Sequence, residues 1–159
     1  MSTIATAIRI AAEAHANQLD KDGRPYILHP IAVMMSLPPG DGQVVAVLHD
    51  VVEDTSVTME DLARAGFSES VLASLRLVTH AKEEPYASYV IRCKADPVAR
   101  AVKMADLRDN TRPERALMRP GILERDASRM ARYLLSYKFL SDEISEADYL
   151  AAMEEVELE

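Results

Sequence analysis

Four polar side chains interrupt an apolar run at residues 44–55. The run VVAVLHDVVEDT contains His49, Asp50, Glu53 and Asp54. Glu53 follows His49 by four residues and Asp50 by three, so a helix would place these side chains on one face. An unpaired carboxylate in an apolar interior is strongly unfavourable. A divalent cation would relieve that cost, and so would arginine or lysine partners from elsewhere in the chain.

Two interpretations of this run stay open from its spacing alone. In the first, all four groups face a buried site. In the second, Glu53 and Asp54 lie past the buried portion, at a frayed helix end that faces water. The adjacent pair His49 and Asp50 fits the second interpretation less well, because apolar residues flank it on both sides.

A second inward carboxylate is expected near residue 106. In VARAVKMADLRDN, Asp106 follows Val102 by four residues and Val98 by eight, which places it on the apolar face of a helix. Asn110 follows one turn later. The plain alternative is a buried aspartate paired with an arginine. His29, in PYILHP, precedes a helix start, where a lone histidine is more often a structural hydrogen-bonding group than a ligand.

Helical patterns dominate the elements that must position these residues, and no run alternates as a strand would. Residues 43–53 are apolar nearly all round, which predicts a buried helix. The candidate N-caps are Ser2, Thr58, Ser68 and Asp96, the last followed by a proline. We expect an all-α fold of seven to nine helices. Its predicted helices include 3–17, 31–37, 43–53, 97–110 and 121–140, with others after the caps at 58 and 68.

Composition favours one globular domain over residues 1–159, since 48% of the residues are hydrophobic. Its motif-bearing core is expected at about 3–140, with an acidic helix at about 145–157. Eight of the 26 acidic residues lie in 139–159, leaving 18 acids against 18 bases elsewhere. This balance argues against a nucleic-acid binder. No run approaches the roughly 20 apolar residues of a membrane span. The single cysteine and the lack of a signal-peptide pattern predict a cytoplasmic protein.

The segment 92–119 is locally basic, with eight Lys or Arg residues against four acids. It forms either a solvated helical face or a patch that meets a small anionic ligand such as a polyphosphate. Lys103, Arg108 and Arg112 lie near Asp106 in sequence and are candidates to offset phosphate charge.

Three motifs occur in order along the chain: AHANQLDKDGRPYILHP, AVLHDVVEDTSVT and AVKMADLRDN. Together they resemble the hydrolase domain of the RelA/SpoT family, within the HD-domain metal-dependent phosphohydrolases, from about residue 3 to 140. The resemblance implies a small, stand-alone alarmone hydrolase. Such an enzyme removes the 3′-pyrophosphate from guanosine tetra- or pentaphosphate and typically uses manganese, although another divalent cation would suit the same ligands.

The resemblance also implies roles for individual residues. Its metal ligands match His29, His49, Asp50 and Asp106. The acidic pair that engages the nucleophilic water matches Glu53 and Asp54, and substrate-binding positions match Asn110 and Lys21. Two imidazoles and two carboxylates suit a borderline-hard divalent ion. Such an ion lowers the pKa of a bound water, and Glu53 and Asp54 could orient that water and move its proton.

One position departs from the family pattern. Where the alarmone hydrolases usually carry an Arg-Lys pair that contacts guanine, this chain has Asp20 and Lys21. A carboxylate cannot supply the cation–π contact of a guanidinium. The first hypothesis is therefore a (p)ppGpp hydrolase, with a small phosphorylated nucleotide as its partner. The second is an HD phosphohydrolase for another nucleotide or phosphate ester. The third is a metal-stabilised module that binds nucleotide without turnover.

Overall fold

The protein is helical throughout the part of the chain that the structure describes. The computed structural model describes residues 3–158, so the predicted cap Ser2 lies outside it. The ten helices are α1 (Ile4–Ala14), α2 (Leu28–Met35), α3 (Asp41–Leu48), α4 (Val51–Asp54), α5 (Met59–Arg64), α6 (Glu69–Val78), α7 (Tyr86–Lys94), α8 (Pro97–Asn110), α9 (Leu123–Leu140) and α10 (Glu146–Leu158). The all-α prediction is confirmed. The helices number nine when α3 and α4, which only two residues separate, are counted together.

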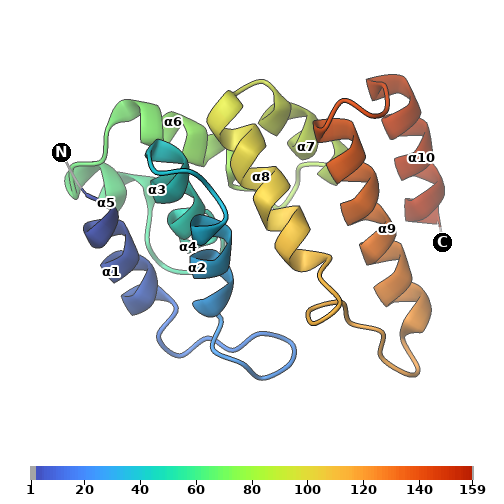
Figure 1. Cartoon of the computed structure of the whole chain (residues 1–159), viewed down its shortest axis with the longest axis horizontal. Coiled ribbons are helices and arrows are strands. Elements are labelled where there is room, and N and C mark those ends of the chain that lie inside the picture. The colour runs from blue at the N-terminus through green and yellow to red at the C-terminus, as the bar shows by residue number, and fades with distance from the viewer. Residues whose placement is uncertain (1–2, 159) are drawn as a thin grey trace.

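α3 lies at the centre of the first half of the fold, packed against α1, α2, α6 and α8 (Figure 1). Residues 45–48 are fully buried, as the all-round apolar pattern predicts. The prediction of one continuous helix over 43–53 is wrong, because the helix breaks at His49 and Asp50. There the His49 ring nitrogen Nδ1 donates to the carbonyl oxygen of Ala46 at 2.7 Å. This local side-chain bond accompanies the turn that separates α4 from α3.

α8 runs between two groups of helices, with α2, α3 and α6 on one side and α7 and α9 on the other (Figure 1). Asp96 caps its N-terminus by accepting the backbone N–H of Ala99 at 2.7 Å, and Pro97 occupies the first turn. Both features confirm the predicted start. Val102 and Leu107 are fully buried. This central position brings the C-terminal half of α8 beside α2 and α3.

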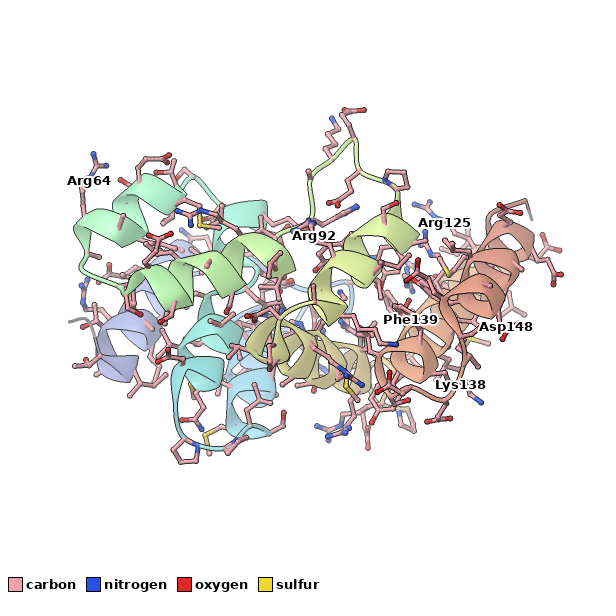
Figure 2. All side chains as sticks on the ribbon, turned by 90° about the horizontal axis from the view of Figure 1, so that it is seen from above. Arg64, Arg92, Arg125, Lys138, Phe139 and Asp148 are labelled. Carbon is pink, nitrogen blue, oxygen red and sulfur yellow. The ribbon has the colours of Figure 1, made fainter. Side chains whose placement is uncertain are left out.

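The connection between α6 and α7 stands out from the body of the molecule as a loop (Figure 2). Arg92, labelled in Figure 2, lies at its base and pairs with Glu84 at 2.6 Å. The same guanidinium donates to three carbonyl oxygens at the end of α6, those of Arg76, Leu77 and Thr79. Through these contacts, Arg92 fixes the loop that carries His80. The sequence did not predict α7, since no side-chain cap precedes it.

The start of α9 is secured by a fully buried carboxylate. Asp126 accepts from Arg119 at 2.7 Å and from Arg129 at 3.1 Å, which ties the segment 111–122 to α9. α10 packs on the other side of α9, where the Phe139 and Tyr149 rings stack with centroids 4.7 Å apart. Within residues 3–158, no helix combines the length and the apolar character needed to cross a bilayer.

Candidate active site

Four side chains from distant parts of the sequence converge where α2, the α3–α4 turn and α8 meet. His29 Nε2 lies 3.2 Å from Asp106 Oδ1 and 3.6 Å from Asp50 Oδ2. His49 Nε2 lies 3.1 Å from Asp50 Oδ2 and 3.7 Å from Asp106 Oδ1. Ligand atoms of His29, His49 and Asp50 all lie within 4.8 Å of one another. The structure therefore brings together all four residues that the resemblance implies as metal ligands.

The other ring nitrogen of each histidine is already engaged. His29 Nδ1 bonds to Asp109 Oδ2 at 2.7 Å, and His49 Nδ1 bonds to the Ala46 carbonyl oxygen at 2.7 Å. A carboxylate or carbonyl oxygen only accepts, so each Nδ1 carries the hydrogen. In the neutral ring, each Nε2 then presents a lone pair to carboxylate oxygens. His49 Nε2 is buried without a hydrogen-bond partner.

Lone pairs that face carboxylate oxygens need a positive charge between them, either a proton or a cation. Burial of the His29 ring acts to lower its pKa, but hydrogen bonds to Asp106 and Asp109 and the charge of Asp50 outweigh burial and raise the pKa to about 9. The pKa of His49 is raised as well, because the charges of Asp50 and Asp106 outweigh its burial. The same excess of negative charge suits a divalent cation. The donor set therefore fits a metal site of His and Asp ligands.

Each carboxylate of the cluster is also oriented from outside. Asp50 Oδ2 accepts the hydroxyl of Tyr26 at 2.7 Å. Asp106 Oδ2 accepts from Lys103 Nζ at 2.8 Å, and Asp106 Oδ1 accepts from Asn110 Nδ2 at 2.5 Å. Burial acts to raise the pKa of Asp106, but Lys103 and the two histidines hold it well below its ordinary value. Such outer partners fix the direction in which a ligand presents its lone pairs.

Glu53 and Asp54 lie beside this cluster and face the pocket. Glu53 Oε2 accepts the backbone N–H of His80 at 2.9 Å, so the α6–α7 loop sets its direction. Asp54 Oδ2 lies 3.5 Å from Gln18 Nε2. Both Glu53 and Asp54 are solvent-exposed at the edge of the pocket. Desolvation nevertheless raises the pKa of Glu53, and the neighbouring charges of Asp50 and Asp54 add to this shift. A carboxylate with a raised pKa is a better proton acceptor.

The cluster forms the floor of a cavity of about 500 Å³. Its walls come from the loop before α2, from α7, α8 and α9, and from the segment after α8. Four tyrosines line it, together with four cationic side chains, and the polar floor is acidic. The residues concerned are Tyr26, Tyr86, Tyr89 and Tyr133, then Lys21, Lys103, Arg115 and Arg129, and then Asp50, Glu53, Asp54 and Asp106. Anionic and planar groups of one ligand could be accommodated together in such a cavity.

The predicted substrate-binding residues divide into two groups. Lys21, Lys103 and Asn110 line the cavity. The structure does not bring Arg108 or Arg112 to it. Arg108 donates to the Tyr137 hydroxyl at 2.8 Å on the outer side of α8. Arg112 is more than half exposed and lies nearest to acidic neighbours. Helical geometry turns both guanidinium groups away, since they stand on other faces of α8 or past its end.

Asp20, the position that departs from the family pattern, is used within its own loop. Its Oδ1 accepts the backbone N–H groups of Asp22 and Arg24, each at 2.9 Å. Its Oδ2 lies 3.7 Å from Arg115 Nη1. Although Asp20 lines the cavity, its carboxylate shapes a turn, which is a common use of aspartate.

Some residues that shape the site were not predicted from the sequence. Tyr26 and Asp109 each bond to a candidate ligand, and His80 and Arg115 line the cavity. For Asp109 a signal existed, because it follows Asp106 by three residues and so lies on nearly the same helical face. For Arg115, no spacing in the sequence indicates which carboxylates it meets.

Lys103 provides a test of the charge balance. It is buried, pairs with Asp106 and lies over the ring of Tyr89, with Nζ 4.9 Å from the ring centroid. With a chelator present, we expect Lys103→Met to lower the free energy of unfolding by about 3 kcal/mol, because a buried carboxylate loses its partner. With saturating Mn²⁺ the loss should be smaller, since the cation would compensate Asp106.

Urea denaturation under both conditions measures the two losses. Lys138→Met, at an exposed lysine of α9 labelled in Figure 2, is the matched control. An equal loss with and without Mn²⁺ would show that no cation reaches Asp106.

Comparisons with known proteins extend over much of the chain. No family model matches it. The zebrafish protein named guanosine-3′,5′-bis(diphosphate) 3′-pyrophosphohydrolase MESH1 is 36% identical over 121 residues, which cover 66% of this chain and 65% of that protein. An Aquifex aeolicus protein named guanosine-3′,5′-bis(diphosphate) 3′-pyrophosphohydrolase is 31% identical over 121 residues, covering 69% of this chain and 17% of that protein. The chain thus spans less than two thirds of either relative.

A solved structure, described as a metazoan orthologue of SpoT that hydrolyses ppGpp, shares the fold. It superimposes with a TM-score of 0.68 at 21% identity and covers 98% of this chain and 94% of that one.

Proposed function

We propose that this chain is an HD-domain alarmone hydrolase of the RelA/SpoT type and acts as a metal-dependent (p)ppGpp 3′-pyrophosphohydrolase. The observation that carries the proposal is the convergence of two histidine Nε2 atoms on the carboxylates of Asp50 and Asp106, at 3.1 to 3.7 Å. We further propose that residues 1–159 act as one domain and work in the cytoplasm. A reducing compartment suits the single cysteine, Cys93, which is buried as a free thiol.

In this proposal, His29, His49, Asp50 and Asp106 hold Mn²⁺ or another divalent cation. When bound, the cation supplies Lewis-acid activation of water and phosphate near neutral pH. Glu53 accepts a proton from the attacking water, and Asp54 helps to orient that water. Both carboxylates are suited to this task because they face the cavity beside the ligand cluster. The raised pKa of Glu53 brings its basicity closer to what a general base requires.

The cationic walls of the cavity bind the phosphate groups of the substrate. Lys103 lies closest to the cluster through its contact with Asp106. Lys21 and Arg129 line the wall formed by the loop before α2 and by α9. Burial and the nearby charge of Arg129 lower the pKa of Lys21. An anionic ligand would relieve this repulsion between cations, which supports a polyphosphate as the substrate.

One specific observation favours a second candidate, an HD phosphohydrolase that acts on another nucleotide or phosphate ester. The carboxylate of Asp20 stands where the related enzymes usually present a guanidinium to guanine, and it is engaged in a turn. The hydrolytic groups are therefore better supported than the choice of base. Against a module that binds without turnover stand Glu53 and Asp54, because binding alone requires no acidic pair beside the ligands.

The experiment that separates these candidates is a substrate panel. Purified protein with Mn²⁺ should release pyrophosphate from ppGpp, and it should do so faster than from the adenine analogue or from simple phosphate esters. Release should stop with a chelator and return when Mn²⁺ is restored. Hydrolysis of another ester without ppGpp hydrolysis would support the second candidate. Tight nucleotide binding without any hydrolysis would support the third.

A further inference from the structure

A chain of three charged residues, Asp20, Arg115 and Asp109, joins the loop before α2 to the candidate metal ligand His29. His29 Nδ1 bonds to Asp109 Oδ2 at 2.7 Å. Arg115 Nε lies 3.1 Å from the same Asp109 oxygen. Arg115 Nη1 lies 3.7 Å from Asp20 Oδ2. The guanidinium thus stands between two carboxylates from different parts of the fold, one on α8 and one in the loop.

Burial makes these contacts strong enough to matter. The side chains of Asp109 and Asp20 are 8% and 12% exposed, and that of Arg115 is 22% exposed. Ion pairs at this depth are screened far less than pairs on the surface. Arg112 also approaches Asp109, but at 3.6 Å and with 56% of its side chain exposed. Arg115 is therefore the principal cation of Asp109.

The orientation of the His29 ring depends on its hydrogen bond to Asp109. Asp109 fixes the ring tautomer and its rotation, so that Nε2 points at the cluster of Asp50 and Asp106. Removing a partner of a metal-ligating histidine typically lowers metal affinity by about 10- to 100-fold. Arg115, from the segment after α8, forms an ion pair with the same Asp109 oxygen that bonds to His29, although its Nε is not aligned as a hydrogen bond.

We propose that Arg115 is a positioning residue for His29, acting through Asp109, and that Asp20 anchors Arg115. This inference rests on the proposed metal site. It gives Asp20 a role: the carboxylate at this position holds a guanidinium that arrives from the segment after α8. The loop before α2 and the metal ligand are consequently linked, and a change in the loop alters how His29 presents Nε2.

The test is a Mn²⁺ titration of the full chain by calorimetry, with a set of matched variants. Arg115→Met should weaken Mn²⁺ binding by about 10-fold, the lower end of the effect of removing a direct partner of a ligand, because Arg115 acts through Asp109. Arg115→Lys should recover part of the loss, because it keeps the charge. Asp20→Asn retains an oxygen for the turn and removes only the charge that faces Arg115, so it should shift affinity in the same direction by less. Arg112→Met should have a smaller effect than Arg115→Met.

Arg64→Met is the control, since Arg64 lies on α5 at the far edge of the molecule (Figure 2) and should leave Mn²⁺ affinity unchanged. A second measurement needs no metal: nitrogen-edited NMR of the metal-free protein records the resonance of the His29 Nδ1–H proton. Its resonance should shift in Arg115→Met and stay in place in Arg64→Met.

Together, the Mn²⁺ titration and the NMR measurement distinguish failure of the proposed metal site from failure of the positioning role. If the wild type does not bind Mn²⁺, the proposed metal function fails, and the NMR shift alone decides the positioning role. If the wild type binds Mn²⁺ and Arg115→Met binds equally well with an unmoved His29 resonance, the positioning role is wrong. Thermal melting of each variant verifies that the fold is retained.

Discussion

Asp50→Ala is expected to abolish Mn²⁺ binding and pyrophosphate release together. The Asp50 carboxylate lies close to both histidine Nε2 atoms, at 3.6 Å from His29 and 3.1 Å from His49. Its removal takes away a ligand and the negative charge that favours a cation. Activation by a bound metal is worth several kcal/mol of transition-state stabilisation, so turnover should fall by roughly 10³-fold or more. Calorimetric Mn²⁺ titration and a pyrophosphate release assay measure the two effects.

The alanine also leaves the hydroxyl of Tyr26 without its acceptor, so Asp50→Asn is needed as a second variant. Asparagine retains an oxygen for Tyr26 but lacks the charge. Both variants should fail to bind Mn²⁺ if Asp50 is a ligand. Asp41→Ala, at the exposed start of α3, removes a carboxylate from the same segment and should leave turnover intact. Full Mn²⁺ binding by Asp50→Ala would remove Asp50 from the ligand set.

The local signals in the sequence predicted several element starts correctly. Thr58 and Asp61 form the expected capping box of α5, and Ser68 caps α6 by accepting the N–H of Val71. Asp96 begins α8 as predicted. These features depend on residues three positions apart, so the sequence carries them directly. The break between α3 and α4 was not predicted, because it accompanies a bond from the His49 ring to a backbone carbonyl.

Convergence of the candidate ligands could be expected only through the resemblance to a known family. Spacing alone placed His49 and Asp50 together, and it left His29 as a more ordinary structural histidine. The packing of α2 and α8 against α3 brings His29 and Asp106 to the same point. Residue types could not tell which cations reach the cavity: Lys103 does, whereas Arg108 meets Tyr137. That choice depends on the rotation of α8, which the tertiary contacts fix.

Two distant loops control the two halves of the proposed chemistry. The segment after α8 reaches the ligand side through Arg115, Asp109 and His29. The loop between α6 and α7 reaches the water side, because the N–H of His80 bonds to Glu53. The loop is in turn held by Arg92 and Glu84. We therefore expect mutations in these two loops to affect the proposed cation binding and proton transfer separately.

Glu53→Gln makes that separation measurable. Glutamine keeps the size of the side chain and an oxygen that can accept the N–H of His80. It cannot take up a proton. We expect Mn²⁺ affinity to change by less than the roughly 10-fold that loss of an orienting partner causes. The rate of the chemical step should fall by about 10²- to 10⁴-fold, the usual contribution of a general base.

Single-turnover measurements at saturating Mn²⁺ isolate the chemical step from product release. Asp54→Asn, at the neighbouring carboxylate, should slow the same step by a smaller factor, because Asp54 is assigned to orient the water and not to take its proton. Loss of Mn²⁺ binding in Glu53→Gln would instead make Glu53 a ligand. An unchanged rate with bound Mn²⁺ would leave another group as the base, and His80, whose backbone already contacts Glu53, would then be the residue to substitute next.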